Sequence, residues 1–130
     1  LETLAVPAQT GRWFRRDETR VNGPRLVLLS SELWRSAFAS RSDIVGQTIE
    51  ADGVQNEVMG IMPAGFDVMD NRVELWLPLQ LNPSNRQNRG GHFLNVIGRV
   101  KDGITPAQAQ SELATLVASW GERTGAKEHV

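Results

Sequence analysis

The strongest constraint on the fold of this chain is a hairpin pattern within residues 43–63. Two runs rich in β-forming residues, 48–51 and 54–62, flank the pair Asp52 and Gly53. Both residue types tolerate the positive φ angles that a two-residue hairpin turn demands. The sequence therefore predicts a β-hairpin that ends before Pro63.

Two registers of this hairpin remain open. Strict two-residue pairing places Ala51 opposite Val54 and Ile49 opposite Asn56, which brings one polar residue to the apolar face. A bulge near Gln55 would shift that residue away, and the pattern alone does not choose between the two.

Three other apolar runs predict further strands. Residues 26–29 form a short continuous run, as in a strand covered on both faces. Residues 75–79 alternate, and Pro78 confines that strand to an edge of the sheet. Residues 93–101 form the longest strand candidate.

Helix signals follow the first and the last of these runs. Ser30 and Ser31 offer N-caps for a short helix that ends near Ser40. Thr105 and Gln108 form a capping-box pattern at the start of a longer helix, which we expect to end at Gly121.

The order of these elements predicts an α+β fold. A mixed β-sheet would carry two helices packed on it, with a hairpin-rich sublobe around 43–80, and residues 1–130 would form a single domain. The chain starts at Leu1 without a leader, so we expect a piece of a longer protein. Its longest apolar run, 26–29, is far shorter than the roughly 20 residues that cross a bilayer.

Charge and composition argue against several classes of protein. Residues 1–41 carry a net charge of +3, residues 42–80 of −6 and residues 81–130 of +2. The arginines of the first segment are interleaved with Asp17 and Glu18 and lack a stacking-aromatic pattern, so nucleic-acid binding is not expected. The absence of cysteine excludes disulfides and zinc-thiolate sites.

Candidate catalytic and metal-binding residues are few, so we predict no enzyme and no cofactor. His92 and His129 lack metal-ligand spacing, and Asp67 with Asp70 does not match an EF-hand loop. Ser30 lacks the glycines of a nucleophile elbow, and no phosphate-binding loop is present.

The chain contains an ordered set of motifs: GRWF (11–14), VLLS (27–30), LW (33–34) with Phe38, DIVGQTI (43–49), DG (52–53), VMGIMPAGF (58–66), ELWLPL (74–79) and VIGRVKDG (96–103), continuing to Leu113. This ordered set resembles the periplasmic core domain of MacB-like ABC transporter permeases.

The resemblance implies a non-catalytic periplasmic domain of a multi-pass inner-membrane protein. Such a domain would couple ATP-driven conformational change to export or to envelope partners. The implied partners are the ABC ATPase, a periplasmic adaptor protein and a second copy of the permease.

Two polar surfaces are candidates for partner contact. One is the hairpin, and the other is the loop 82–92, with Asn85, Arg86, Arg89 and His92. The alternative is a stand-alone ligand-binding or hydrolytic domain in which His92 acts with Asp67 or Asp70. The substitution His92→Ala would separate the two, since a catalytic histidine supports orders of magnitude in rate.

Overall fold

The computed structural model describes residues 3–69, 72–82, 84 and 94–124. The chain forms two compact units, Leu1–Phe93 and Leu94–Val130. The organisation of residues 1–130 as a single domain stays a prediction.

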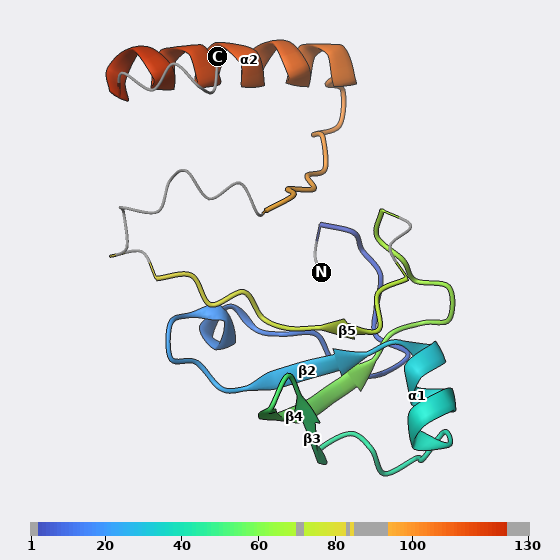
Figure 1. Ribbon diagram of the computed structural model, residues 1–130. Coiled ribbons are helices and arrows are strands. Elements are labelled where there is room, and N and C mark those ends of the chain that lie inside the picture. The colour runs from blue at the N-terminus through green and yellow to red at the C-terminus, as the bar shows by residue number, and fades with distance from the viewer. Residues whose placement is uncertain (1–2, 70–71, 83, 85–93, 125–130) are drawn as a thin grey trace. The chain divides into compact units, whose positions relative to one another are not determined.

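A mixed β-sheet of five strands forms the centre of the first unit (Figure 1). β4 pairs antiparallel with β1 and β3 and parallel with β2, and β2 pairs antiparallel with β5. The mixed sheet and the α+β class agree with the prediction. The strands are β1 (Thr10–Gly11), β2 (Leu26–Leu29), β3 (Thr48–Ala51), β4 (Val54–Ile61) and β5 (Leu75–Trp76).

The parallel pair β2 and β4 holds the core of this unit. All four residues of β2 are buried, as the continuous apolar run predicts, because side chains cover both of its faces. Opposite them, β4 buries Val58 and Ile61. The register shifts between Val27 and Leu28, so Met59 is an extra residue that bulges from β4.

The predicted hairpin is confirmed, and its register is the strict one. Ala51 pairs with Val54 and Ile49 with Asn56, and no bulge occurs at Gln55. The turn residues Asp52 and Gly53 have φ angles of 52° and 73°.

Asn56 is accommodated on the apolar side of the hairpin by a local hydrogen bond. Its side chain is buried, and its Nδ2 donates to the carbonyl oxygen of Val54 at 2.8 Å. A buried amide with a hydrogen-bond partner costs far less than an unpaired one, so the strict register is tolerated.

The helix α1 (Ser31–Phe38) covers one face of the sheet. Ser30 caps it, since its Oγ accepts the Leu33 N–H at 2.9 Å, and the predicted N-cap is confirmed. Leu33 and Phe38 pack against the buried cluster. The helix ends where Ala39 adopts left-handed backbone geometry.

Other predicted boundaries of the first unit need correction. β5 stops at Trp76 rather than continuing to Leu79, because Pro78 cannot donate to a ladder. The structure also contains β1 and a short 3₁₀ helix, η1 (Arg16–Thr19), which the sequence did not indicate.

The second unit contains the helix α2 (Pro106–Thr124). Its capping box is confirmed, with Thr105 N–H donating to Gln108 Oε1 at 2.9 Å and Gln108 N–H to Thr105 Oγ1 at 3.2 Å. The helix continues past Gly121 because a single glycine weakens a helix without breaking it. The packing of this helix on the sheet stays a prediction.

The strand predicted over 93–101 is wrong for its described part, 94–101, which has no regular secondary structure. A strand requires a ladder partner, and the described part of this unit offers no second strand. Among the residues described, no helix combines the length and apolar character needed to cross a bilayer.

Candidate functional site

A cavity of about 760 Å³ lies beside the N-terminal segment of the first unit. Thr3 and residues 5–7 form one part of its wall, and residues 13–16 form the other. The two parts are held by β1, where Gln9 N–H donates to the Ile61 carbonyl oxygen at 2.8 Å and Arg12 N–H to the Met59 carbonyl oxygen at 3.1 Å. The short strand therefore positions both sides of the cavity on the edge of β4.

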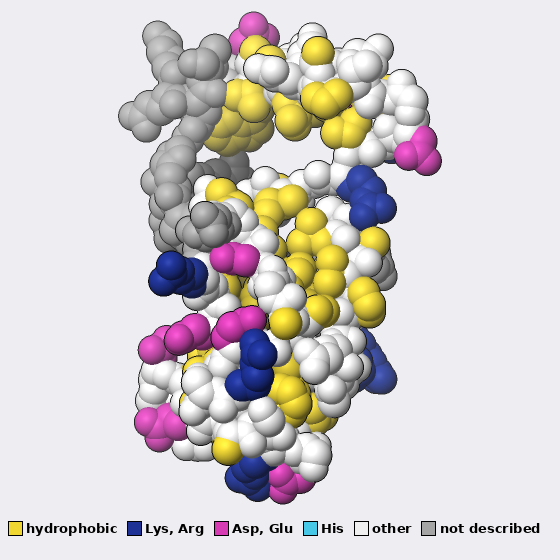
Figure 2. Space-filling model, turned by 90° about the vertical axis from the view of Figure 1, so that its right-hand side faces the viewer, with side chains coloured by type: hydrophobic (Ala, Val, Ile, Leu, Met, Phe, Trp, Pro, Cys, Tyr) yellow, Lys and Arg dark blue, Asp and Glu magenta, His cyan; other side chains and the backbone are white. Residues whose placement is uncertain are grey.

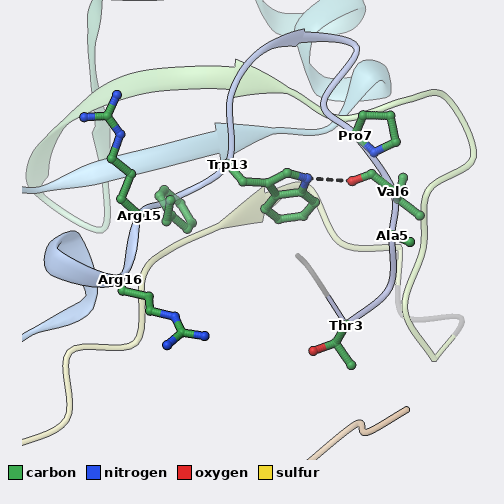
Figure 3. A pocket seen from close by; sticks show the side chains of 8 residues that line it. Thr3, Ala5, Val6, Pro7, Trp13, Arg15 and Arg16 are labelled. Carbon is green, nitrogen blue, oxygen red and sulfur yellow. Dashed lines mark hydrogen bonds between the residues drawn. The ribbon is translucent and has the colours of Figure 1, made fainter. Parts of the chain in front are cut away.

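Trp13 is the fixed aromatic side chain of this wall (Figure 3). Its indole Nε1 donates to the carbonyl oxygen of Val6 at 2.6 Å, which ties the first residues of the chain to the ring. A half-buried tryptophan with a satisfied N–H presents a rigid apolar surface.

The cavity wall continues into an aromatic cluster. Phe66 contacts Trp13 edge-on, with ring centroids 6.0 Å apart, and Trp76 on its other side at 5.4 Å. Phe66 follows the turn at 62–66, and its ring is half-buried between the two tryptophans. A smaller cavity of about 220 Å³ shares Trp13 with the first and reaches Leu77.

The first unit also has several exposed apolar side chains. Leu77, Leu79 and Leu81 are each about half exposed, at 51%, 51% and 52%. Figure 2 shows hydrophobic side chains gathered on one face of the molecule, with charged side chains nearby. Of these three leucines, Leu77 extends the apolar surface of the aromatic cluster, because it lines the smaller cavity together with Trp13 and Trp76.

Beside the cavity, Arg12 forms an ion pair with Glu18. Its guanidinium donates to both carboxylate oxygens of Glu18, at 2.6 and 2.9 Å. These bonds and the Arg15 backbone N–H lower the pKa of Glu18 from 4.5 to about 2. Arg12 therefore serves the segment's own structure.

Arg15 and Arg16 supply the positive charge of the cavity wall. In Figure 3 the side chain of Arg16 reaches toward the space between Trp13 and Thr3, whereas Arg15 extends the other way. None of the described residues that line the cavity carries a carboxylate. The described part of the wall combines apolar side chains with two guanidinium groups.

The loop residues that the sequence marked for partner contact, Asn85, Arg86, Arg89 and His92, lie outside the described residues. The hairpin, the other marked surface, exposes Glu50, Asp52 and Glu57. Partner contact at both surfaces stays a prediction.

The hydrolytic alternative also depends on residues outside the described part, namely His92 and Asp70. Asp67 is described, and its carboxylate accepts the Arg72 backbone N–H at 2.8 Å. Across the described ranges, no three His, Cys, Asp or Glu side chains converge as a metal site would require.

Reasoning from the sequence missed the cavity beside Trp13. The only signal in the sequence was two aromatic residues followed directly by two arginines, at 13–16. The opposite wall, residues 3–7, has no recognisable sequence motif. It contacts Trp13 through the backbone carbonyl oxygen of Val6, which any residue type would supply.

Comparison with known proteins identifies a matching family and a relative. The model of a family described as the MacB-like periplasmic core domain matches residues 1–116. The macrolide export ATP-binding/permease protein MacB of Shigella dysenteriae serotype 1 (strain Sd197) is 26% identical over 106 residues, which cover 78% of this chain. The chain spans 16% of the length of that relative.

Proposed function

This chain belongs to the family of MacB-like periplasmic core domains, and from that premise we propose that it couples ATP-driven movement of an ABC transporter permease to partners in the envelope. The observation that carries the proposal is the family match over residues 1–116. The family is the periplasmic core domain of MacB-like ABC transporter permeases, so its natural setting is transport.

Packing in the first unit supports a mechanical role. The strands β2 and β4 are joined in parallel, and Val27, Leu28 and Val58 at their contact have 0% exposure. Close-packed elements of this kind move as rigid bodies rather than deform continuously. A rigid domain can pass on a displacement that begins elsewhere in a transporter.

We propose that the domain performs no chemistry itself and that the ATPase of the same transporter hydrolyses the nucleotide. The parent permease would work as a homodimer, with this domain on the periplasmic side of the inner membrane. A periplasmic adaptor protein would contact the hairpin and the loop 82–92.

A distance measurement between two copies of the parent permease tests the coupling. The chain has no cysteine, so Asp52→Cys at the hairpin turn gives one labelling position in this domain. Spin labels at this position in the two copies should change their separation when ATP is added. The same distribution with and without ATP, in a transporter that hydrolyses ATP, would contradict the proposal.

A labelled pair inside one domain provides the matched control. Labels at Asp52→Cys and Arg25→Cys should keep a constant separation, since both positions directly adjoin strands of the sheet that we expect to move as one body. Cross-linking from Asn85→Cys in native membranes tests partner docking. Labelling that never captures another envelope protein would argue against that docking.

A further inference from the structure

We propose that Asn22 is a site of spontaneous deamidation, that the folded turn at residues 20–23 slows this reaction, and that the isoaspartyl product prevents the turn from closing again. The modification needs only water. It is separate from the coupling function and rests on the contacts of one turn in the first unit.

The pair Asn22 and Gly23 supplies both reacting groups. The backbone nitrogen of Gly23 loses its proton and attacks Cγ of Asn22, so that a new N–Cγ bond forms and the side-chain NH₂ leaves with a proton as ammonia. Water then opens the resulting succinimide ring. Attack of water at Cγ yields aspartate, whereas attack at the backbone carbonyl carbon of Asn22 yields isoaspartate. Glycine favours ring closure because it has no Cβ to obstruct the approach.

The folded turn engages the nitrogen that would attack. Gly23 N–H donates to the Arg20 carbonyl oxygen at 2.9 Å and closes a β-turn whose third residue, Asn22, has a φ angle of 58°. A positive φ at this position is typical of a type II turn, which favours glycine or asparagine there. Loss of the N–H proton would also lose this hydrogen bond. Since the Asn22 side chain is exposed, the bond rather than burial limits the reaction.

A side chain distant in sequence holds this turn closed. Gln80 Nε2 donates to the carbonyl oxygens of Glu18 at 3.3 Å and of Pro24 at 3.1 Å, one on each side of residues 20–23. Moving these two flanks apart breaks at least one of the bonds. Release of Gln80 is therefore expected to free the Gly23 N–H for reaction.

The isoaspartyl product does not fit the folded turn. Its main chain runs through the former side chain and is one carbon longer before Gly23. The backbone encloses that glycine closely, since a Cβ there would lie 2.6 Å from the Glu18 carbonyl oxygen and 2.9 Å from that of Arg20. Just beyond the turn, the Arg25 carbonyl oxygen accepts the Glu57 N–H at 2.9 Å, where β2 begins to pair with β4. A longer main chain at this point disturbs the entry to that pairing.

Peptide mass spectrometry of the 130-residue chain measures the reaction. The chain is kept for days at neutral pH, once folded and once unfolded in guanidinium chloride. Trypsin cleaves after Arg20 and Arg25 and releases residues 21–25 with Asn22, and a sample digested at the start gives the background. We expect asparagine to be lost at least about tenfold faster in the unfolded chain, which corresponds to an opening free energy of about 1.4 kcal/mol.

The variant Gln80→Ala tests the hold on the turn. When folded, it should lose Asn22 roughly three- to tenfold faster than the wild type, the scale of one or two ordinary hydrogen bonds, and when unfolded it should match the wild type. Gln47→Ala removes an exposed glutamine side chain of the same unit and should react like the wild type in both states. Indole N–H signals in a ¹H–¹⁵N spectrum establish that each variant is folded.

A stability measurement tests the effect of the product. The isoaspartyl chain is isolated by chromatography and compared with Asn22→Asp, which carries the same charge without the longer main chain. The isoaspartyl chain should unfold at a lower denaturant concentration than Asn22→Asp. The proposal is overturned if folded and unfolded wild type react at the same rate, if Gln80→Ala and Gln47→Ala behave alike, or if the isoaspartyl chain is as stable as Asn22→Asp.

Discussion

The carboxylate of Glu18 connects the side chain of Arg12 and the backbone of Arg15 to the short helix η1. It accepts two bonds from the Arg12 guanidinium and a third from the Arg15 backbone N–H at 2.7 Å. Its side chain is 12% exposed, whereas that of Arg12 is 36% exposed. An ion pair that is bidentate and partly shielded contributes more than an ordinary surface pair.

The lowered pKa of Glu18 predicts how this contribution depends on pH. The folded-state pKa of about 2 lies below the unfolded value of 4.5, so the stabilisation is present above pH 4.5 and is lost as pH falls toward 2. We expect Glu18→Gln to lower the free energy of unfolding by about 1–2 kcal/mol at pH 7, after allowance for solvent screening.

Urea unfolding of the wild type and of Glu18→Gln between pH 7 and pH 2 measures this difference. It should shrink steadily below about pH 4.5. Glu50→Gln, which removes an exposed carboxylate of β3, should stay within about 0.5 kcal/mol of the wild type. A Glu18→Gln difference that is constant over this pH range would rule out the ion pair as its cause.

Ala39 and Ser40 follow α1 with φ angles of 49° and 55°, a backbone geometry that glycine adopts without strain. We therefore expect Ala39→Gly to stabilise the chain by about 0.5–1 kcal/mol. Ala37→Gly, at an exposed position inside the same helix, should destabilise it by a similar amount. Equal losses in both variants, measured by urea unfolding, would contradict this account.

At the scale of elements, close backbone approach between β1 and β4 requires two glycines. A Cβ at Gly60 would lie 2.6 Å from the Thr10 carbonyl oxygen, and one at Gly11 would lie 2.2 Å from that of Met59. Both obstacles are backbone atoms, which cannot rotate away. The pairing that supports the wall of the cavity thus depends on the absence of side chains there.

The substitution Gly60→Ala should separate β1 from β4 and destabilise the first unit by roughly 1–3 kcal/mol, as overpacking does elsewhere. Gly98→Ala is the control, since a Cβ there meets nothing within 4 Å and should have little effect. Thermal unfolding measures both. Unchanged stability in Gly60→Ala would show that the two strands can part without cost.

The sequence predicted the elements that depend on local patterns. The hairpin, the cap at Ser30 and the capping box at Thr105 were all correct, because turn and cap preferences act within a few residues. The pairing of β2 with β4 depends on residues distant in sequence and has no local signal.

The candidate site was harder to predict for the same reason. Arg16 and Trp13 are visible in the sequence, but their shared cavity forms only when residues 3–7 return over the indole. The apolar run at 94–101 was misleading because hydrophobic character alone does not supply a ladder partner.

At the scale of the whole molecule, the buried apolar residues lie within one part of the chain. The buried hydrophobic side chains of the described residues run from Leu26 to Met62. In the second unit, Leu113 and Leu116 are 62% and 59% exposed. The buried cluster found among the described residues therefore lies within Leu1–Phe93.

A chain shortened to residues 1–93 should thus fold cooperatively, because it keeps the complete buried cluster. We expect it to retain dispersed indole signals from Trp13, Trp34 and Trp76 and a single unfolding transition. The complementary fragment 94–130 should be only partly helical alone, since isolated helices are marginal in water. A non-cooperative transition in the first fragment would place part of its stability outside residues 1–93.

The parallel contact between β2 and β4 also has a consequence for the time course of folding. The hairpin of β3 and β4 closes over a two-residue turn and can form within microseconds, whereas β2 joins only after the chain between it and β4 has been gathered. We therefore expect β2 docking to limit the folding rate. A newly made chain would spend that interval with the unpaired edge of its most apolar strand open to other chains.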